Sequence, residues 1–381
     1  MTPAHVVSVA DRARRAGLSM VFVHTHPKSP GIPIFSETDD RGERRLADFF
    51  DTRSIVGPHL ALVVGPGGCR CRVLGGDAEI EVVEIGSKLE SLFVPSDDQA
   101  AEQKFDRQIR AFGQSGQKSI QRLTIAIVGL GGTGSAIAQQ VAHLGVRNFI
   151  LIDPDVIETH NLNRLIGATI SDVGAAKVAV ASRQVSAINP GSTIQQISGD
   201  IRDANAARAL LAADFIFCCT DSHASRAIVS QVAYQYLIPC VDMGVGIHVN
   251  GSEIEYIVGR VQLLSPGQAC LICTNSLNSK TIREELLSEE ERRVDAYIVG
   301  ANEPQPAVVS LNSTVASLAV TMFLGVVTQA PAGAKLQFYD AMNGTVRAPQ
   351  AARVQNCVVC SPHGALARGD SWRLPFRAHR Q

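Results

Sequence analysis

The sequence is poor in aromatic residues and in net charge. Phe, Trp and Tyr together make up 5% of the 381 residues, and the formal net charge is −1. Scarce aromatic side chains argue against the stacking platforms of proteins that bind single-stranded nucleic acid. A near-neutral chain also has no basic field that would attract a phosphate backbone. We therefore expect no nucleic-acid partner.

The sequence also lacks the pattern of a secretory signal or of a membrane span. The first residues, MTPAHVVSVADRARR, show no basic stretch followed by a long apolar one. The longest apolar helix, Ser313 to Val327, is short and interrupted by Ser and Thr, which favours a buried core helix. Nine cysteines without a secretory signal favour a reducing compartment and metal ligation over disulfides. These patterns predict a cytoplasmic protein with no membrane partner.

Alternating strand-like and helix-like segments predict an α/β fold with a doubly wound, mostly parallel sheet. From about residue 99 to 345, runs such as LTIAIVG, NFILID and IPCVDMGV alternate with helical stretches such as SAIAQQVAHLG. Residues 1–98 are predicted to form a smaller α/β domain that ends in a hairpin with a Gly-Pro-Gly-Gly turn. We place the second domain at 99–360. Residues 361–381 have little periodicity and several Arg residues, so we expect a mobile tail.

A glycine-rich turn stands between a strand and a helix in the segment AIVGLGGTGSAIAQQV. Gly129, Gly131, Gly132 and Gly134 would let backbone N–H groups and a helix N-terminus face an anion without Cβ atoms in the way. Asp153 ends the next strand, where a carboxylate can accept both hydroxyls of a ribose. These features alone fit a dinucleotide-binding dehydrogenase as well as an ATP-binding enzyme.

The residues that follow favour ATP. The segments DPDVIETHNLNR, SDVGAAK and FCCTDSHASR place Asn161, Arg164, Lys177 and Asp221 on the carboxyl side of the predicted sheet, where ligands of such sheets bind. Two cations and an acid suit a triphosphate with Mg²⁺, because they neutralise charge on the β- and γ-phosphates. A pyrophosphate bridge between two nucleosides does not require so many cations.

This succession of motifs resembles the ThiF/MoeB/HesA-type adenylyltransferases, the bacterial relatives of ubiquitin-activating enzymes. The upstream segment RQIRAFGQSGQ is similar to the family's lead-in, so the resemblance runs from Arg107 to Cys360. It implies that ATP is attacked at the α-phosphate by the C-terminal carboxylate of a ubiquitin-like or sulfur-carrier protein, usually a β-grasp protein ending in Gly. The products are an acyl adenylate and pyrophosphate. A conjugating-enzyme-like protein is an expected acceptor.

The resemblance also implies a role for each residue. The four glycines cradle the phosphates, Asp153 holds the ribose and Asp221 coordinates Mg²⁺. The triphosphate is bound by Asn161, Arg164 and Lys177. Arg107 is an arginine finger that reaches the site of a partner subunit, which implies a homodimer. The catalytic set is therefore Arg107, Arg164, Lys177 and Asp221.

Two C-x-x-C pairs predict a structural zinc site. Cys270 and Cys273 would join Cys357 and Cys360, and four thiolates are a ligand set that Zn²⁺ takes in tetrahedral geometry. The 84-residue gap between the pairs is long for a local zinc finger, but the resembled family has a site of this kind. Free thiols are the alternative.

The cysteine that forms a thioester in related enzymes has no counterpart here. Residues 274–356 contain no Cys, although that is where the nucleophile would be sought. Cys240 is the least unlikely substitute. We therefore expect adenylation without transthiolation. The alternatives are a peptide-modifying nucleotidyltransferase and a non-catalytic scaffold that binds nucleotide or a ubiquitin-like protein.

The N-terminal region carries a second metal-binding pattern. In VFVHTHPKSPGIPIFSETDD, His24 and His26 lie on one face of a strand and Asp39 follows Ser36. This resembles part of a JAMM (JAB/MPN) metallopeptidase, in which two His and one Asp bind catalytic zinc. The family's general-base Glu lies upstream of the histidines, whereas Glu37 is the first Glu of this chain. Either the sequence starts within such a domain, or the domain is degenerate and structural. A second zinc site and peptidase activity are two separate expectations that this pattern leaves open.

Overall fold

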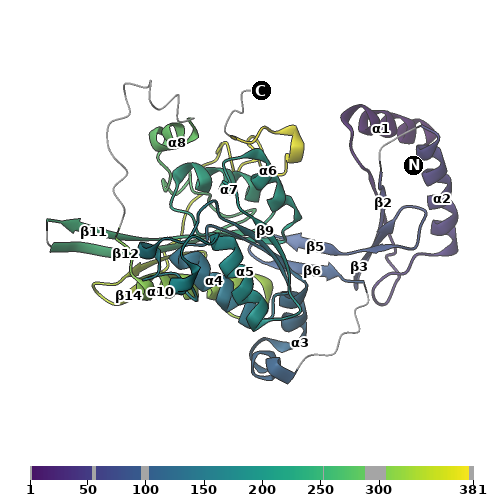
Figure 1. Cartoon of the computed structure of the whole chain (residues 1–381). Coiled ribbons are helices and arrows are strands. Elements are labelled where there is room, and N and C mark those ends of the chain that lie inside the picture. The colour runs from purple at the N-terminus through teal and green to yellow at the C-terminus, as the bar shows by residue number, and fades with distance from the viewer. Residues whose placement is uncertain (1, 54–56, 96–102, 252, 288–305, 377–381) are drawn as a thin grey trace. The chain divides into compact units, whose positions relative to one another are not determined.

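The computed structural model describes residues 2–53, 57–95, 103–251, 253–287 and 306–376. The chain divides into two compact units, which are considered separately below (Figure 1). The first comprises Met1–Glu84 with Leu89–Ala100, and the second comprises Ile85–Lys88 with Ala101–Gln381. The sequence analysis placed the boundary after residue 98. The short segment Ile85–Lys88 belongs to the second unit.

The first unit is a small sheet with two helices. Helix α1 (Pro3–Ala16) begins after Thr2, whose side chain caps it, and ends at Gly17 in the left-handed conformation. Strand β1 (Val21–Thr25) pairs in parallel with β2, which continues antiparallel into β3 and β4. Helix α2 (Glu37–Asp51) and α1 share a core around Phe50 and Ala61. The remaining strands are β2 (Leu60–Gly65), β3 (Gly68–Val73), β4 (Glu79–Ile80), β5 (Val82–Ile85) and β6 (Leu89–Phe93).

The second unit is built on an eight-stranded sheet in the order β14-β13-β12-β11-β10-β7-β8-β9. The five strands from β11 to β9 pair in parallel, and β12, β13 and β14 add an antiparallel edge. Strands β8 and β9 are added on one side of β7, and the later strands β10 and β11 are added on its other side. The carboxyl end of β7 is therefore a topological switch point. The strands are β7 (Thr124–Val128), β8 (Asn148–Ile152), β9 (Thr193–Ile197), β10 (Phe215–Cys218), β11 (Cys240–Asn250), β12 (Glu253–Leu264), β13 (Leu336–Asp340) and β14 (Thr345–Arg347).

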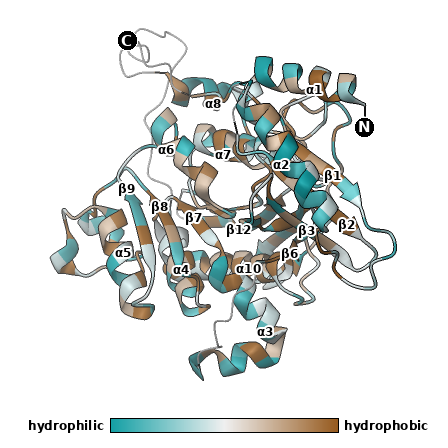
Figure 2. Ribbon diagram, turned by 90° about the vertical axis from the view of Figure 1, so that its right-hand side faces the viewer, coloured by the Kyte–Doolittle hydropathy of each residue, from teal (hydrophilic) through white to brown (hydrophobic). Residues whose placement is uncertain are grey.

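Helices cover both faces of this sheet, as the predicted doubly wound fold requires. One layer holds α4, α5 and α10, and the other holds α6, α7 and α8 (Figure 1). Strand β7 is hydrophobic along its length, whereas α5 carries both hydrophobic and hydrophilic faces (Figure 2). The helices are α3 (Asp106–Arg122), α4 (Gly132–His143), α5 (Lys177–Ile188), α6 (Ala204–Ala209), α7 (His223–Gln235), α8 (Ser279–Leu286) and α10 (Val309–Val327).

Helix α10 is the apolar helix noted in the sequence. Its length and composition alone would allow it to cross a membrane, but half of it is buried within the fold. It packs on α4, β11 and β12, and its Phe323 contacts Phe215 and Phe217 of β10. The interpretation as a core helix therefore agrees with its packing.

The segment predicted as a mobile tail is packed over residues 361–376. The Ala367 N–H donates to the Tyr234 carbonyl at the end of α7, and the Gln235 side chain donates to the carbonyls of Gly369 and Trp372. Leu374 is buried in the same core as α7. Weak periodicity did not reveal these contacts because they are made by backbone groups of an irregular segment. Residues 377–381 lie outside the described part of the chain.

Candidate functional site: nucleotide turn and metal centres

The glycine turn after β7 is held in a conformation that side chains would prevent. Gly129 has φ of +87°, and a Cβ there would lie 2.9 Å from the Cys219 carbonyl oxygen. A Cβ on Gly134 would lie 1.9 Å from the Gly129 carbonyl oxygen. The turn is therefore pressed against the end of β10 and folded onto the first turn of α4. Neither position can carry a side chain without moving the backbone.

The N-terminus of α4 is open to an anion. Gly131 is its N-cap and makes no side-chain cap, and a Cβ on Gly131 would meet no atom within 4 Å. Gly132 instead packs against Asn312 of α10. The first N–H groups of a helix have no partner within the helix and carry partial positive charge. The cradle therefore fits a phosphate group.

Asp153 is joined to this turn directly. One carboxylate oxygen accepts a hydrogen bond from the Leu130 N–H at 2.6 Å, and the other accepts from the Asp155 N–H at 2.9 Å. The side chain is almost completely buried. Burial raises the pKa of Asp153, while the Lys177 charge and the two N–H donors oppose that rise. The structure thus brings the predicted ribose ligand beside the predicted phosphate cradle.

Lys177 lies close to the same acid. It is the first residue of α5, and its ammonium group lies 2.7 Å from an Asp155 carboxylate oxygen and 3.8 Å from Asp153. Its side chain is 12% exposed, whereas that of Asp155 is 61% exposed. Lys177 therefore lies beside Asp153, which is bonded to the turn, and it is paired with Asp155, to which the sequence analysis assigned no role.

Asn161 and Arg164 lie on a short irregular segment that follows β8. The Asn161 side chain accepts from the Glu158 N–H, and the Arg164 guanidinium donates to the His160 carbonyl. The segment is fixed to the start of α4, because the Ile166 N–H donates to the Ser135 hydroxyl. The two predicted phosphate ligands thus make local contacts, and only their segment is joined to the first turn of α4.

Asp221 stands on the loop that follows β10. The same loop supplies the Cys219 carbonyl against which Gly129 packs, so Asp221 follows closely after the wall of the turn. Asp221 is exposed, while the next residue, Ser222, caps helix α7. The placement suits a carboxylate that meets a ligand above the turn.

Arg107 lies at the far end of α4 from the glycine turn. Its neighbour Gln108 donates to the carbonyl of His143, the last residue of α4. A twelve-residue helix is about 18 Å long at 1.5 Å per residue. The Arg107 side chain is exposed. The fold therefore places Arg107 at the end of α4 away from its own chain's glycine turn.

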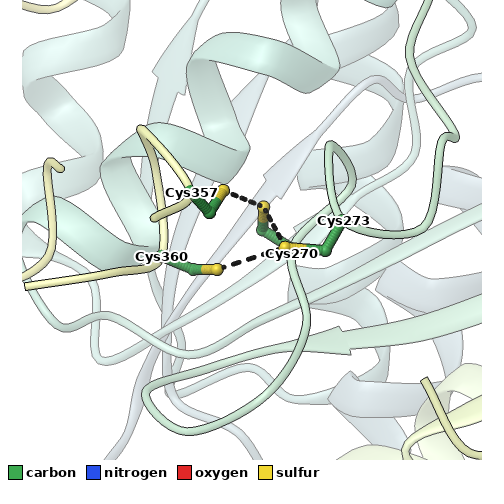
Figure 3. A group of neighbouring side chains, drawn as sticks. All are labelled: Cys270, Cys273, Cys357 and Cys360. Atoms are coloured by element: carbon green, nitrogen blue, oxygen red, sulfur yellow. Dashed lines mark hydrogen bonds between the residues drawn. The ribbon is translucent and has the colours of Figure 1, made fainter. Parts of the chain in front are cut away.

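The two C-x-x-C pairs meet at one point, although 83 residues lie between Cys273 and Cys357 (Figure 3). The Cys270 and Cys357 sulfurs are 3.4 Å apart, as are those of Cys273 and Cys360. All four sulfurs lie within 4.8 Å of one another. A tetrahedral zinc with bonds of about 2.3 Å needs sulfurs about 3.8 Å apart, so the set fits the metal. The Val354 N–H donates to the Cys273 sulfur.

The other cysteines are poor nucleophiles. Cys218 and Cys240 are fully buried, and burial raises the pKa of both thiols, as it does for the half-buried Cys219. Deprotonated thiolate is the reactive form. The suggestion that Cys240 could substitute for the absent thioester cysteine was therefore wrong, because a thiol in the centre of the sheet meets neither solvent nor substrate.

A buried ionic network beside the Asp221 loop was missed by sequence reasoning. Asp242 of β11 is fully buried between Arg226 and Arg260, which bind it from α7 and β12. Arg226 also donates to the Thr220 carbonyl, immediately before Asp221. Through Arg226, the network holds the backbone of the loop at Thr220. Arg226 follows the Thr-Asp-Ser motif by four residues, and that spacing, one helical turn, was the available signal.

In the first unit, the predicted histidines and aspartate do meet. The His24 and His26 Nε2 atoms lie 3.2 and 3.3 Å from the two carboxylate oxygens of Asp39. Their three ligand atoms lie within 4.8 Å of one another. Asp39 is held by the backbone N–H and hydroxyl of Ser36, the cap of α2. The His24 Nε2 is buried and faces the Asp39 carboxylate without an aligned hydrogen bond, an arrangement that a shared metal ion would explain.

Comparison with known proteins identifies the second unit. Residues 105–359, well over half of the chain, match the ThiF family. This chain belongs to the ThiF family. The match begins two residues before Arg107 and ends one residue before Cys360, so it spans the turn, the Asp221 loop and three of the four cysteines.

The ThiF-family relatives are named for adenylation. The molybdopterin-synthase adenylyltransferase of Escherichia coli K12 is 29% identical over 259 residues, which cover 68% of this chain and 95% of the relative. The ubiquitin-like modifier-activating enzyme 5 of Oryza sativa is 28% identical over 186 residues, covering 44% of this chain and 42% of that protein. These names confirm the prediction of an adenylyltransferase of the ubiquitin-activating type.

Solved structures show the same fold. A crystal structure of Escherichia coli MccB with ATP has a TM-score of 0.53 and 20% sequence identity, covering 68% of this chain and 75% of MccB. A crystal structure of PaaA has a TM-score of 0.52 and 19% sequence identity, covering 69% of this chain and 88% of PaaA. At this identity the likeness supports the α/β architecture and no particular substrate.

Proposed function

We propose that this protein uses ATP to adenylate the C-terminal carboxylate of a ubiquitin-like or sulfur-carrier protein. The main support is one contact: the Leu130 N–H of the glycine turn donates a hydrogen bond to the Asp153 carboxylate, and Lys177 lies beside that carboxylate. This joins a cradle for phosphate to an acceptor for ribose hydroxyls. The family membership and the names of its relatives support the same reaction.

The proposed step is a substitution at the α-phosphate. A carboxylate oxygen of the carrier protein forms a bond to the α-phosphorus, and the bond to the oxygen bridging to the β-phosphate breaks. The products are the acyl adenylate and pyrophosphate. Lys177 and Arg164 would balance charge on the departing phosphates, and the α4 N-terminus would hold the nucleotide. Mg²⁺ held by Asp221 would supply further neutralisation of phosphate charge.

The proposal includes a homodimer with Arg107 acting in trans. Arg107 lies at the opposite end of α4 from its own turn, so it can assist adenylation only at another subunit's site. The proposal also includes a reducing, cytoplasmic setting, which the nine free cysteines support. A zinc ion bound by the four clustered cysteines would fasten the segment after β12 to residues 357–360.

The proposal assigns no thioester step to this chain. Five cysteines lie outside the metal cluster, and none of them is exposed. Burial raises the pKa of each of these five thiols. The adenylate would pass directly to a nucleophile on an acceptor, with a conjugating-enzyme-like protein as one such acceptor.

ATP–pyrophosphate exchange tests the proposed reaction. Exchange should depend on a carrier protein with an intact C-terminal Gly, and removal of that residue should abolish it. The Asp221→Ala variant should show no exchange. ATP binding without exchange for any β-grasp carrier would instead support the non-catalytic scaffold, and exchange driven by a short peptide would support a peptide-modifying enzyme.

We also propose a second zinc ion in the first unit, at His24, His26 and Asp39. Their converging ligand atoms support it, because both His Nε2 atoms point at the Asp39 carboxylate. The resemblance to JAMM metallopeptidases suggests cleavage of a carrier-protein tag. No counterpart of that family's Glu precedes the histidines in this sequence, so the proposal extends to metal binding and leaves peptidase activity as a separate measurement.

Zinc analysis of the whole chain tests this second site. Wild-type protein should hold two zinc ions per chain, and His26→Ala should hold one. The control is Asp77→Asn, an exposed acid of the same unit, which should leave both ions. One zinc in both proteins would contradict the proposal. Cleavage of a carrier fusion that His26→Ala abolishes would establish peptidase activity.

A further inference from the structure

The carboxylate of Glu285, on α8, caps a helix to which it does not belong. Its Oε2 atom accepts two hydrogen bonds, one from the Ser222 hydroxyl at 2.6 Å and one from the Ala224 N–H at 2.6 Å. Ser222 is the N-cap of α7, and Ala224 lies in its first turn. A carboxylate at this position is favoured by the partial positive charge of the helix N-terminus.

These bonds fix the backbone on both sides of Asp221. On the preceding side, the Thr220 carbonyl accepts from the Arg226 guanidinium. On the following side, Ser222 is held by Glu285, and its own N–H donates to the Thr220 hydroxyl. Asp221 stands between these anchored residues with an exposed side chain. Its direction is therefore set largely by its neighbours.

Helix α8 is itself fixed by neighbours from the rest of the second unit. Leu277 and Leu286 pack against the core that contains α7 and the metal-binding cysteines. The Asn278 N–H donates to the His223 side chain at 3.2 Å. Arg202 donates to the Glu285 carbonyl. The carboxylate of Glu285 is thus delivered to α7 by a helix that is anchored at both ends.

We propose that Glu285 is a positioning residue for the metal-bound nucleotide, acting through Asp221. It holds the loop 220–224 so that the Asp221 carboxylate is oriented for Mg²⁺ before the ion arrives. The inference deepens the proposed function and rests on it for the role of Asp221. It assigns to α8 a part in nucleotide binding through the loop that carries Asp221.

The test is direct ATP binding to the full-length protein, with and without Mg²⁺, which needs no carrier protein. Glu285→Ala should need about tenfold more Mg²⁺ for half-maximal ATP binding, because two hydrogen bonds to a charged group are lost. Glu285→Gln keeps an acceptor oxygen and should stay within about threefold of wild type. Without Mg²⁺, all variants should bind ATP equally.

The matched control is Glu284→Ala, which removes an equal charge one residue away on the same helix, where Glu284 faces Lys280. Its Mg²⁺ requirement should match that of wild type. If Glu285→Ala does not fold, Ser222→Ala removes one of the two donors and should shift the Mg²⁺ requirement in the same direction.

Two outcomes would overturn the inference. The first is an unchanged Mg²⁺ requirement in folded Glu285→Ala, and the second is an equal loss of ATP binding with and without Mg²⁺, which indicates a merely structural role. Normal Mg²⁺–ATP binding by wild type without exchange would refute the proposed adenylation while leaving this measurement valid. The two failures are therefore distinguishable.

Discussion

The Asp153 carboxylate accepts a hydrogen bond from the Leu130 N–H inside the glycine turn, at 2.6 Å. The residue predicted to hold the ribose therefore also fixes the shape of the loop predicted to hold the phosphates. The two halves of a nucleotide site are coupled through one buried side chain. A change at Asp153 should consequently affect more than one contact with the ligand.

Asp153→Asn should weaken ATP binding about tenfold to a hundredfold and also lower the stability of the fold. The amide has one acceptor oxygen for the two N–H groups of Leu130 and Asp155, and an unmatched buried donor costs about 1–3 kcal/mol. Calorimetric titration and thermal unfolding measure the two effects. Asp77→Asn, an exposed acid of the first unit, should change neither. Full ATP affinity in Asp153→Asn would contradict the assignment.

Lys177→Ala should abolish exchange and also lower the unfolding temperature, because the buried Asp153 carboxylate loses the cation that lies 3.8 Å away. Its ion pair with Asp155 is largely exposed on the aspartate side, and such pairs contribute about 0–1 kcal/mol. Asp155→Asn breaks the same pair but leaves the lysine. That variant should keep exchange within about fivefold of wild type. If both variants lost exchange equally, the pair rather than the lysine would be the required feature.

Removal of zinc should destabilise the second unit. Cys357→Ser replaces one of four thiolates, and structural zinc contributes directly to folding free energy. We expect a lower unfolding temperature and the loss of one zinc per chain by elemental analysis. Cys219→Ala removes a thiol outside the cluster and should retain the metal. Unchanged zinc content in Cys357→Ser would show that the cluster does not hold it.

Arg183→Gln should reduce stability at neutral pH, and the difference from wild type should shrink in acid. The hydrogen bonds from Arg183, with those from Thr169, lower the pKa of Asp172 in the fold. A lowered folded-state pKa contributes stability above the unfolded value of about 3.9, and this stability is lost as pH falls through the folded pKa. Urea unfolding at pH values from neutral to acid measures it. Lys280→Gln should show no such convergence.

Mixing two inactive variants tests the role of Arg107. Arg107→Ala and Asp221→Ala should each lack exchange as homodimers. In mixed dimers, the Arg107→Ala subunit keeps Asp221 and receives Arg107 from its partner. An equal mixture should recover about a quarter of wild-type activity, since half of the dimers are mixed and one of their two sites is complete. No recovery after proven subunit exchange would refute action in trans.

Much of the second unit could be predicted from its sequence because its signals are local. The glycines at 129 and 134 are required by backbone geometry, and both were found from their place between a strand and a helix. The two C-x-x-C pairs were matched across the gap by ligand chemistry together with the family resemblance. In the first unit, the two-residue spacing of His24 and His26 placed them on one face.

Other features depended on contacts that no local pattern records. In the sequence, Glu285 is one of several charged residues in a polar helix, and nothing local indicates a partner. Only the fold brings its carboxylate to the N-terminus of α7. Asp242 and its two arginines come from separate elements and meet because β11 pairs with β12 and α7 packs above them. The packing of residues 361–376 rests on backbone hydrogen bonds, which leave no periodicity in side chains.

The sequence by itself predicted the fold class, the glycine turn and the two groups of candidate metal ligands, because backbone freedom and ligand chemistry are properties of residue type. Only the tertiary structure decided that Arg107 lies at the end of α4 away from the glycine turn and that Cys240 is buried inside the sheet. It also decided that the Asp221 loop is held by a carboxylate from α8. Distance and burial arise from packing between elements, and the order of residues along the chain does not contain them.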